Sequence, residues 1–344
     1  LIFADRRLAA VYPAIQKFKS LVSSDPRNVT VSWVGADVCR YRGFYCDSPP
    51  DNSSAVAVAS VDFNGFHLTA PTLAGFIDQL PDIAIFHANS NFFSGGVPVG
   101  IARLPYLYEL DLSNNLLSGD FPAEILAMGG FSLLDIRFNF FTGAVPPAIF
   151  AGNLNFLFIN NNDFITTLPE ISVSAHLLFL TLANNRLFGP IPASIGVIFS
   201  GVSEILLQNN SLTGCLPYQL GLLKEVVVID AAENQLTGPL PTSIACLEKV
   251  EILNLAGNRL YGSVPDLLCR LSKLTNLSLS DNYFTVAGDS CMGLIRSGVL
   301  DLTNNCIPGL PFQRPPMECA AFFAGQPSCP NQYIFSKIPC RIPF

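Results

Sequence analysis

Carboxylates recur in the sequence beside leucines, and their spacing points to two kinds of chemistry. Asp111 stands in the stretch ELDLSNN, and Asp135 stands 24 residues later in LLDIRFN. If the two stretches form neighbouring parallel strands, the carboxylates lie side by side about 4.8 Å apart. This is close to the separation of the two carboxylates of a retaining glycosidase. At this distance like charges also repel by roughly 1 kcal/mol even in water, so that the pair favours a cation.

The residues that would complete a catalytic site are not found. The three histidines, His67, His87 and His176, occupy positions that assemble no Ser-His-Asp or Cys-His pattern. Any row of acidic residues on adjacent parallel strands places its carboxylates at the separation seen in glycosidases, so the distance alone does not indicate catalysis. In addition, the face of a sheet is open and is not a pocket that excludes water. We therefore expect no enzymatic activity, no cofactor and no metal site, although an acidic column can hold calcium loosely.

Composition limits the class of protein and its partners. Of the 344 residues, 50% are hydrophobic and 13% are charged, which argues against disorder. The net charge of -7 argues against nucleic acid and anionic membrane surfaces, and it favours a basic partner. No eighteen consecutive residues are apolar and uncharged, so no membrane-spanning helix is expected.

Cysteines and glycosylation signals indicate the compartment. The ten cysteines are accompanied by four N-glycosylation sequons, at Asn28, Asn52, Asn209 and Asn276. Together they favour an oxidising, secretory environment. Since the chain lacks a charged and then apolar leader, we interpret it as the mature form after signal cleavage.

A repeat runs through most of the chain. Its frame is L-x-L-x-x-N-x-L-x-G-x-I/L/V-P, and its asparagines recur every 23 to 25 residues. They are Asn91, Asn115, Asn139, Asn162, Asn185, Asn210, Asn234, Asn258, Asn282 and Asn305. An eleventh copy at the N-terminal end has Phe66 in place of the asparagine. A fixed period of this length is the signature of a solenoid.

Each element of the frame has a physical role. The two leucines of L-x-L point from a short strand into a shared core, and the residue between them points outward. The buried asparagine bonds backbone groups that the bend leaves unpaired. Glycine permits a positive φ, and proline stops the ladder of hydrogen bonds. The frame predicts a leucine-rich-repeat solenoid, a curved right-handed superhelix with a parallel β-sheet on its concave face and short 3-10 or α segments on its convex side.

Both ends carry the features of disulfide-containing caps. Apolar residues at helical spacing over residues 5–22 precede Trp33 and the pair Cys39 and Cys46. After Asn305 come four cysteines and several prolines. We therefore expect an N-terminal helical cap over residues 1–55, about eleven repeats over 56–311, and a Cys/Pro-rich C-terminal cap over 312–344.

Several motifs resemble those of a known family. The G-x-I/L/V-P element resembles the plant extracellular subtype of leucine-rich repeats, and CRYRGFYC resembles its N-terminal cap. The run NNC…P…QR-x-P-x-ECAAF is similar to the end of the repeat domain in plant leucine-rich-repeat extensins. Extensins continue into a Ser-Pro-rich tail that is not seen here, so the chain looks like a tail-less relative. Receptor kinases and, more distantly, polygalacturonase-inhibiting proteins share the repeat.

Cys39 and Cys46 are expected to form one disulfide. The remaining eight cysteines allow 105 connectivities, and sequential pairing is the simplest proposal. That proposal pairs Cys215 with Cys246, Cys269 with Cys291, Cys306 with Cys319, and Cys329 with Cys340.

The repeat register identifies the side chains of the concave face. They are Asp62, His87, Glu109, Asp111, Asp135, Arg137, Phe138, Phe156, Phe158, Phe179, Thr181, Glu204, Leu206, Asp230, Glu233, Asn254, Asp281 and Asp301. Nine of them are acidic and Arg137 is basic, so the negative charge is concentrated on this face. One interpretation is a solvated polar face, and the other is a binding surface for a cationic peptide.

Aromatic residues interrupt this acidic face. Phe138, Phe156, Phe158 and Phe179 come from three successive repeats and, with Leu206, predict an apolar patch between acidic flanks. Phe141, Phe164 and Phe284 stand in a leucine position and are expected in the core. The alternatives are that neighbouring side chains cover the rings, or that the register slips in the repeat with Thr166 in place of glycine.

Two sequons also fall on the predicted concave face. Glycans at Asn209 and Asn276 would block its C-terminal half and leave repeats one to six open. Asn28 and Asn52 lie in the cap region and are expected to carry ordinary surface glycans.

We expect a secreted, non-enzymatic recognition protein of the plant cell wall or apoplast. Its resemblance to the extensin-type proteins implies binding of basic, cysteine-rich signalling peptides of the rapid-alkalinisation-factor kind. One alternative is inhibition of a wall-degrading enzyme such as polygalacturonase. Another is a structural role through self-association into a homodimer or fibre.

Overall fold

The computed structural model describes residues 1–170, 176–330 and 340. The chain divides into two compact units, Leu1–Phe164 and Ile165–Phe344. Each unit contains a main sheet, which is built from the L-x-L segments, and a second sheet, which is built from the segments after the repeat asparagines. The expected boundaries at residues 55 and 311 stay predictions, and residues 331–339 and 341–344 of the predicted C-terminal cap lie outside the described residues.

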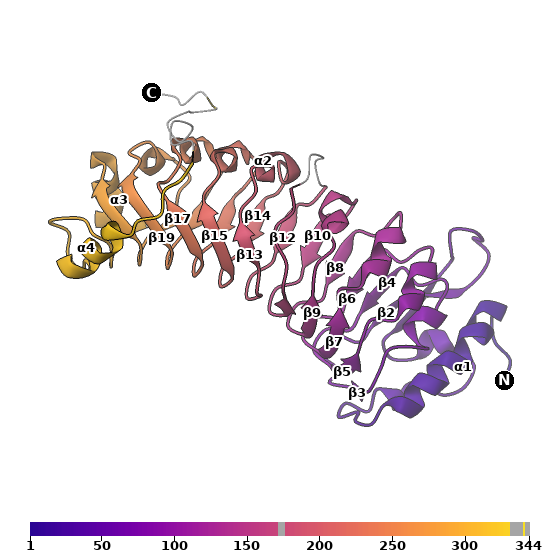
Figure 1. Ribbon diagram of the computed structural model, residues 1–344. Coiled ribbons are helices and arrows are strands. Elements are labelled where there is room, and N and C mark those ends of the chain that lie inside the picture. Colours follow the sequence, from indigo (N-terminus) through magenta and orange to yellow (C-terminus); the bar gives the residue numbers. More distant parts are fainter. Residues whose placement is uncertain (171–175, 331–339, 341–344) are drawn as a thin grey trace. The chain divides into compact units, whose positions relative to one another are not determined.

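In the first unit, helix α1 (Arg6–Leu21) precedes the sheets (Figure 1). The main sheet has the order β1 (Phe44–Asp47), β2 (Ala57–Asp62), β4 (Ile85–His87), β6 (Glu109–Asp111), β8 (Leu133–Asp135) and β10 (Phe156–Phe158). β1 is antiparallel to β2, and the others are parallel. The second sheet contains β3 (Thr69–Ala70), β5 (Phe92–Gly95), β7 (Leu116–Asp120), β9 (Phe140–Gly143) and β11 (Asp163–Phe164). The 3-10 helices are η1 (Thr30–Ser32), η2 (Val38–Arg40), η3 (Ile77–Gln79), η4 (Val99–Arg103), η5 (Ala123–Ala127) and η6 (Pro147–Ala151).

The second unit repeats this plan. Its main sheet has the order β12 (Phe179–Thr181), β14 (Glu204–Leu206), β16 (Val228–Asp230), β18 (Ile252–Asn254), β20 (Asn276–Ser278) and β22 (Leu300–Asp301). The second sheet contains β13 (Phe188–Pro190), β15 (Ser211–Cys215), β17 (Gln235–Gly238), β19 (Arg259–Val264) and β21 (Tyr283–Ala287). The helices are α2 (Ile195–Ile198), η7 (Tyr218–Leu222), η8 (Thr242–Cys246), η9 (Leu268–Arg270), α3 (Asp289–Arg296) and α4 (Pro316–Ala324).

The repeat frame forms these elements for the expected reasons. Leu110 and Leu112 are fully buried, and Asp111 between them is half-buried on the other side of the strand. The side-chain amide of Asn115 donates to the carbonyl oxygens of Ala88 (2.9 Å) and Leu112 (3.0 Å). These bonds join consecutive repeats, because the acceptors belong to two of them. The predicted leucine-rich-repeat solenoid with cysteine-containing caps is confirmed.

The N-terminal cap packs as its apolar spacing predicts. Leu8, Val11, Ile15 and Phe18 of α1 are buried. The side chain of Asp5 accepts a hydrogen bond from the backbone N–H of Arg7 (2.8 Å) and so caps the helix. Among the described residues, no helix is both long enough and apolar enough to cross a membrane.

Two of the expected disulfides are wrong. The pairs Cys39–Cys46, Cys269–Cys291 and Cys306–Cys319 form as expected. However, Cys215 pairs with Cys329 rather than with Cys246, and Cys246 pairs with Cys340.

The path of the C-terminal segment explains this correction. After α4 the segment crosses the second sheet of the second unit (Figure 1). The ring of Phe322 stacks on that of Tyr283 with 3.6 Å between ring centroids, and the Tyr261 hydroxyl donates to the carbonyl oxygen of Pro327 (2.8 Å). Cys329 is thereby brought to Cys215 on β15. Pairing by proximity in sequence fails because the segment folds back over earlier repeats.

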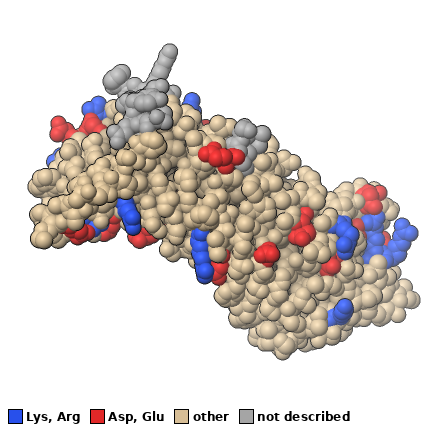
Figure 2. All heavy atoms as spheres, viewed as in Figure 1, with Lys and Arg blue, Asp and Glu red and all other residues tan. Residues whose placement is uncertain are grey.

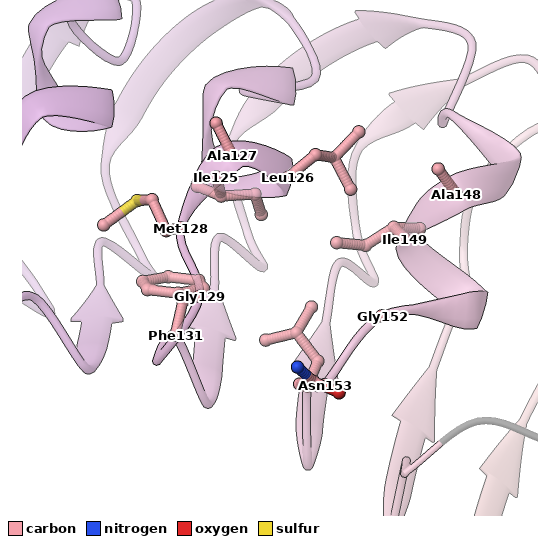
Figure 3. Close-up of a pocket in the computed structure, with 11 residues that line it drawn as sticks. Ile125, Leu126, Ala127, Met128, Gly129, Phe131, Ala148, Ile149, Gly152 and Asn153 are labelled. Carbon is pink, nitrogen blue, oxygen red and sulfur yellow. The ribbon is translucent and has the colours of Figure 1, made fainter.

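A cavity of about 220 Å³ separates η5 from η6 in the first unit (Figure 3). Several 3-10 helices contain a buried isoleucine or leucine, and a second buried leucine follows it three positions later. Leu104, Leu223 and Leu247 are examples of this second leucine. In η6 this residue is Gly152, which lines the cavity with Ile149 and Met128. The missing leucine side chain accounts for the space.

Replacing Gly152 with leucine is expected to raise the free energy of unfolding by about 1 kcal/mol. The φ of Gly152 is −81°, which any residue adopts, and a Cβ there would meet atoms no closer than 3.6 Å. Chemical denaturation of the first unit measures the effect. Gly152→Ala is the matched control. Like leucine, alanine reduces the backbone freedom of the unfolded chain, but it does not fill the cavity. A leucine variant no more stable than the alanine variant would contradict the cavity-filling argument.

Candidate ligand-binding surface

The open face of the main sheet is the side that points away from the buried leucines. In the first unit, parallel pairing aligns one side chain from each strand into a column. The register places His87 opposite Asp62 and Asp111, and it places Asp135 opposite Asp111 and Phe158. Sequence analysis predicted this column, and the structure brings its members together within one unit.

The acidic residues of the column are held by local hydrogen bonds. Asp62 accepts from the backbone N–H of Asn64 (3.0 Å), and Asp111 accepts from that of Ser113 (2.9 Å). These bonds fix the carboxylates over the end of each strand. Beside the column, the Nε2 of His87 lies 3.0 Å from an Oε2 of Glu109, a contact that the sequence did not predict. A positive charge on His87 would partly neutralise this corner of the face.

Asp135 differs from the carboxylates of a solvated polar face, which was one of the two interpretations of the acidic residues. It is only 3% exposed. Its Oδ1 accepts from the backbone N–H of Arg137 (3.1 Å), and its Oδ2 lies 3.0 Å from the Arg137 Nε. Burial raises the pKa of Asp135 to about 7, with a further increase from the charge of Asp111 and an opposing effect from Arg137. Near neutral pH this carboxyl group is therefore present in both its neutral and its charged form.

Phe156 and Phe158 point to the open face, as predicted, but they are half-buried there. Leu157 between them is fully buried in the core, as is Phe164. The two rings lie 6.2 Å apart, and the guanidinium of Arg137 lies 5.3 Å from the centre of the Phe158 ring. The rings therefore pack against each other and against the chain's own cation.

Phe138 lies in the turn before Asn139 rather than in a strand column, and its place on the concave face stays a prediction. It follows the end of β8 with a φ of +54°, and it is 47% exposed. The corresponding turn residues of other repeats include Asn114 and Asn161, which also have a positive φ. Asparagine tolerates this region better than other side chains, so a phenylalanine there is unusual.

The other candidates lie on the main sheet of the second unit. Phe179 is in register with Glu204, and Leu206 is in register with Asp230. All four are half-buried, and Asp230 accepts from the side-chain amide of Asn254 (3.0 Å). Phe156 and Phe158 belong to the first unit and Phe179 and Leu206 to the second, and the predicted apolar patch that joins them stays a prediction.

All four sequon asparagines are exposed. Asn276 lies on β20 next to the buried Leu277, which places its side chain on the open face of the second unit. Asn209 has a φ of +53°, and its side-chain nitrogen, the atom to which a glycan would be attached, donates to Asn184 (2.8 Å). Glycosylation of these sites stays a prediction.

A further exposed group was missed by the sequence analysis. Phe92, Leu116 and Phe140 each follow a repeat asparagine and are 47%, 45% and 54% exposed on the second sheet of the first unit. The sequence could have indicated their exposure, because the residue after the repeat asparagine is charged in other repeats. Arg186 and Arg259 occupy this position. They favour the self-association alternative, which stays a prediction.

Charged side chains away from the open face do not gather into a metal site in the described part of the chain. On the face seen in Figure 2, acidic and basic side chains are scattered among uncharged residues. Within residues 1–170, 176–330 and 340, no three His, Cys, Asp or Glu side chains gather as ligands for a metal ion.

Comparison with known proteins first defines the class. The model of the family described as Leucine Rich Repeat matches residues 106–128 and 249–271. The plant peptide hormone receptor RGFR1, solved in complex with RGF2, has a TM-score of 0.62 and 27% identity over 72% of this chain and 41% of the receptor chain. A plant ice-binding protein shares the fold, with a TM-score of 0.72, 21% identity and coverage of 89% of this chain and 97% of its own.

Closer similarity identifies the family. Leucine-rich repeat extensin-like protein 7 of Arabidopsis thaliana is 41% identical over 347 aligned residues, which cover 99% of this chain and 79% of the relative. The chain therefore belongs to the leucine-rich repeat extensin-like family. Protein 4 of the same family and organism is 46% identical over 60% of this chain, and protein 2 is 43% identical over 67%. The matched part of the chain spans only 41% of protein 4 and 29% of protein 2.

Proposed function

We propose that this chain is a secreted, non-enzymatic recognition module of the plant cell wall or apoplast that binds a basic peptide or protein. Membership of the extensin-like family supports the location, and none of the relatives named above is called an enzyme. The similarity to a peptide hormone receptor supports peptide binding. A small, cysteine-rich signalling peptide is the kind of ligand that we propose.

The observation that carries the proposal is the column of carboxylates on the open face of the first unit. Asp111 and Asp135 are opposite each other on adjacent strands, and Asp62 and Glu109 extend the negative region. A cation seated beside Asp111 would relieve the repulsion between the carboxylates. Its approach would also be steered by their field.

The aromatic pair supplies the second half of the proposed site. Phe156 and Phe158 occupy the strand next to Asp135, so apolar and acidic surfaces adjoin on one sheet. Partly buried aromatic rings with a polar rim are typical of residues that dominate binding energy at interfaces. A basic peptide with an apolar side chain fits both surfaces.

A charge-removal experiment tests the proposal. The double variant Glu109→Gln/Asp111→Asn is expected to bind acetylated hexa-arginine amide about tenfold more weakly than the unchanged protein, because two attractions of roughly 0.5–1 kcal/mol are lost. Calorimetric titration at low salt measures the affinity, and the difference should shrink as salt rises.

The matched control is Asp120→Asn/Glu124→Gln. It removes the same two charges from β7 and η5 of the same unit, away from the main sheet. Equal weakening in both double variants would mean that only net charge matters. The proposed site on the open face would then be wrong.

A further inference from the structure

Asp135 is the most enclosed carboxylate of the open face. Its side chain is 5% exposed, and the register places Asp111 on one side of it and Phe158 on the other. Leu134 and Ile136, its neighbours in the chain, are fully buried. A charge at Asp135 is therefore poorly hydrated, and it stands beside a second carboxylate.

The contacts of Arg137 show what kind of chemical group binds beside Asp135. Arg137 places its Nε 3.0 Å from the Oδ2 of Asp135 and its guanidinium 5.3 Å from the centre of the Phe158 ring. A carboxylate beside an aromatic face is a favourable environment for a guanidinium. The Arg137 side chain is 41% exposed, so solvent and a ligand can reach the group.

The net charge of Asp111, Asp135 and Arg137 together depends on whether Asp135 carries its proton. With Asp135 neutral, the negative charge of Asp111 is balanced by Arg137. With Asp135 ionised, the three side chains carry one net negative charge. Three further charged or titratable side chains lie on the open face of the neighbouring strands. They are Asp62 on β2, His87 on β4 and Glu109 on β6.

We propose that cation binding on this face is coupled to the release of a proton from Asp135, so that the first unit holds a basic ligand more tightly at neutral pH than in acid. The coupling rests on the proposed function and adds to it a regulation of ligand binding by pH. A cation bound beside Asp111 and Asp135 favours the ionised carboxylate, and by linkage ionisation favours the cation. The pKa of about 7 places this exchange near neutrality.

Linkage also fixes the size of the effect. Release of one proton per bound ligand changes the affinity by up to tenfold for each pH unit below about 7, until the pKa of the bound form is reached. Affinity for a basic peptide should therefore rise between pH 5 and pH 7 and level off above that.

The test uses the whole chain and acetylated hexa-arginine amide at constant ionic strength. Calorimetric titrations at pH 5, 6, 7 and 8, each in two buffers of different ionisation enthalpy, give both the affinity and the number of protons released. The unchanged protein should gain at least tenfold in affinity between pH 5 and 7 and release up to one proton near pH 6. Asp135→Asn should lose both effects.

His87→Gln separates the two titratable candidates. Histidine is the other side-chain type on this face whose ordinary pKa lies between pH 5 and 8, so it is the alternative source of a dependence on pH. Whatever its absolute affinity, this variant should keep the dependence on pH if Asp135 is the source. Thermal unfolding confirms that each variant is folded.

Three results would overturn the coupling. Binding that is equal at pH 5 and 8 without proton release removes the coupling and leaves the proposed function standing. A dependence that persists in Asp135→Asn, or that vanishes in His87→Gln, assigns the proton to another group. Absence of binding at every pH, with the variants folded, removes the proposed function itself.

Discussion

Replacing Asn139 with alanine is expected to lower the free energy of unfolding by about 3–5 kcal/mol. The side-chain amide donates to the carbonyl oxygens of Leu112 (2.9 Å) and Ile136 (3.1 Å), and its oxygen accepts from the backbone N–H of Leu117 (2.9 Å). Alanine leaves these buried groups without their partner. Each unsatisfied buried group costs about 1–3 kcal/mol, and water cannot easily replace the amide in a closed repeat.

Urea-induced unfolding measures this effect. The fluorescence of Trp33, the only tryptophan of the sequence, reports on the first unit, which also contains Asn139. The control is Asn153→Ala, because that asparagine is exposed. If the two variants lose similar stability, the asparagine bonds do not hold the repeats together.

Asp135→Asn is expected to raise the free energy of unfolding at pH 8 by up to about 4 kcal/mol and to leave it nearly unchanged at pH 4. The pKa of Asp135 is about 7 in the folded protein against an ordinary value of 3.8. Between these values the folded state binds more protons than the unfolded state, so rising pH lowers stability. Above pH 7 the full penalty is present, and asparagine removes it while keeping an acceptor for the Arg137 N–H.

The pKa of about 7 already includes the opposing effect of Arg137, so the loss of this ion pair is part of the expected change. Unfolding curves at pH 4, 6 and 8, followed by Trp33 fluorescence, give the profile. Asp120→Asn is the matched control, since Asp120 is exposed on β7. A gain of the same size at pH 4 and pH 8 would show that ionisation of Asp135 is not its source.

The interval of the asparagines predicted the fold because each one satisfies a local requirement. Asn115 must reach the carbonyl oxygens of two consecutive repeats, and only a stack of nearly identical units provides them. The same periodicity predicted which side of a strand Leu157 and Phe158 face, because side chains alternate along a strand. The fold and the register of the open face therefore followed from short-range rules.

The contacts between distant residues could not be predicted in this way. Cys215 and Cys329 are separated by 114 positions, and their disulfide depends on a C-terminal segment that folds back over the second sheet. Periodicity places Asp135 on the open face, but its burial depends on the side chains that surround it. The cavity beside Gly152 likewise appears only when two neighbouring 3-10 helices are packed together.

The sequence by itself determined the solenoid, the acidic column and the outward direction of Phe156 and Phe158. These features depend on the alternation of side chains within a strand and on a period that stacks one strand on the next. Only the tertiary structure decided that Arg137 lies over Phe158 and that Asp135 is enclosed beside Asp111. The physical reason is that burial, and the pKa that follows from it, are set by neighbours from other strands rather than by position in the repeat.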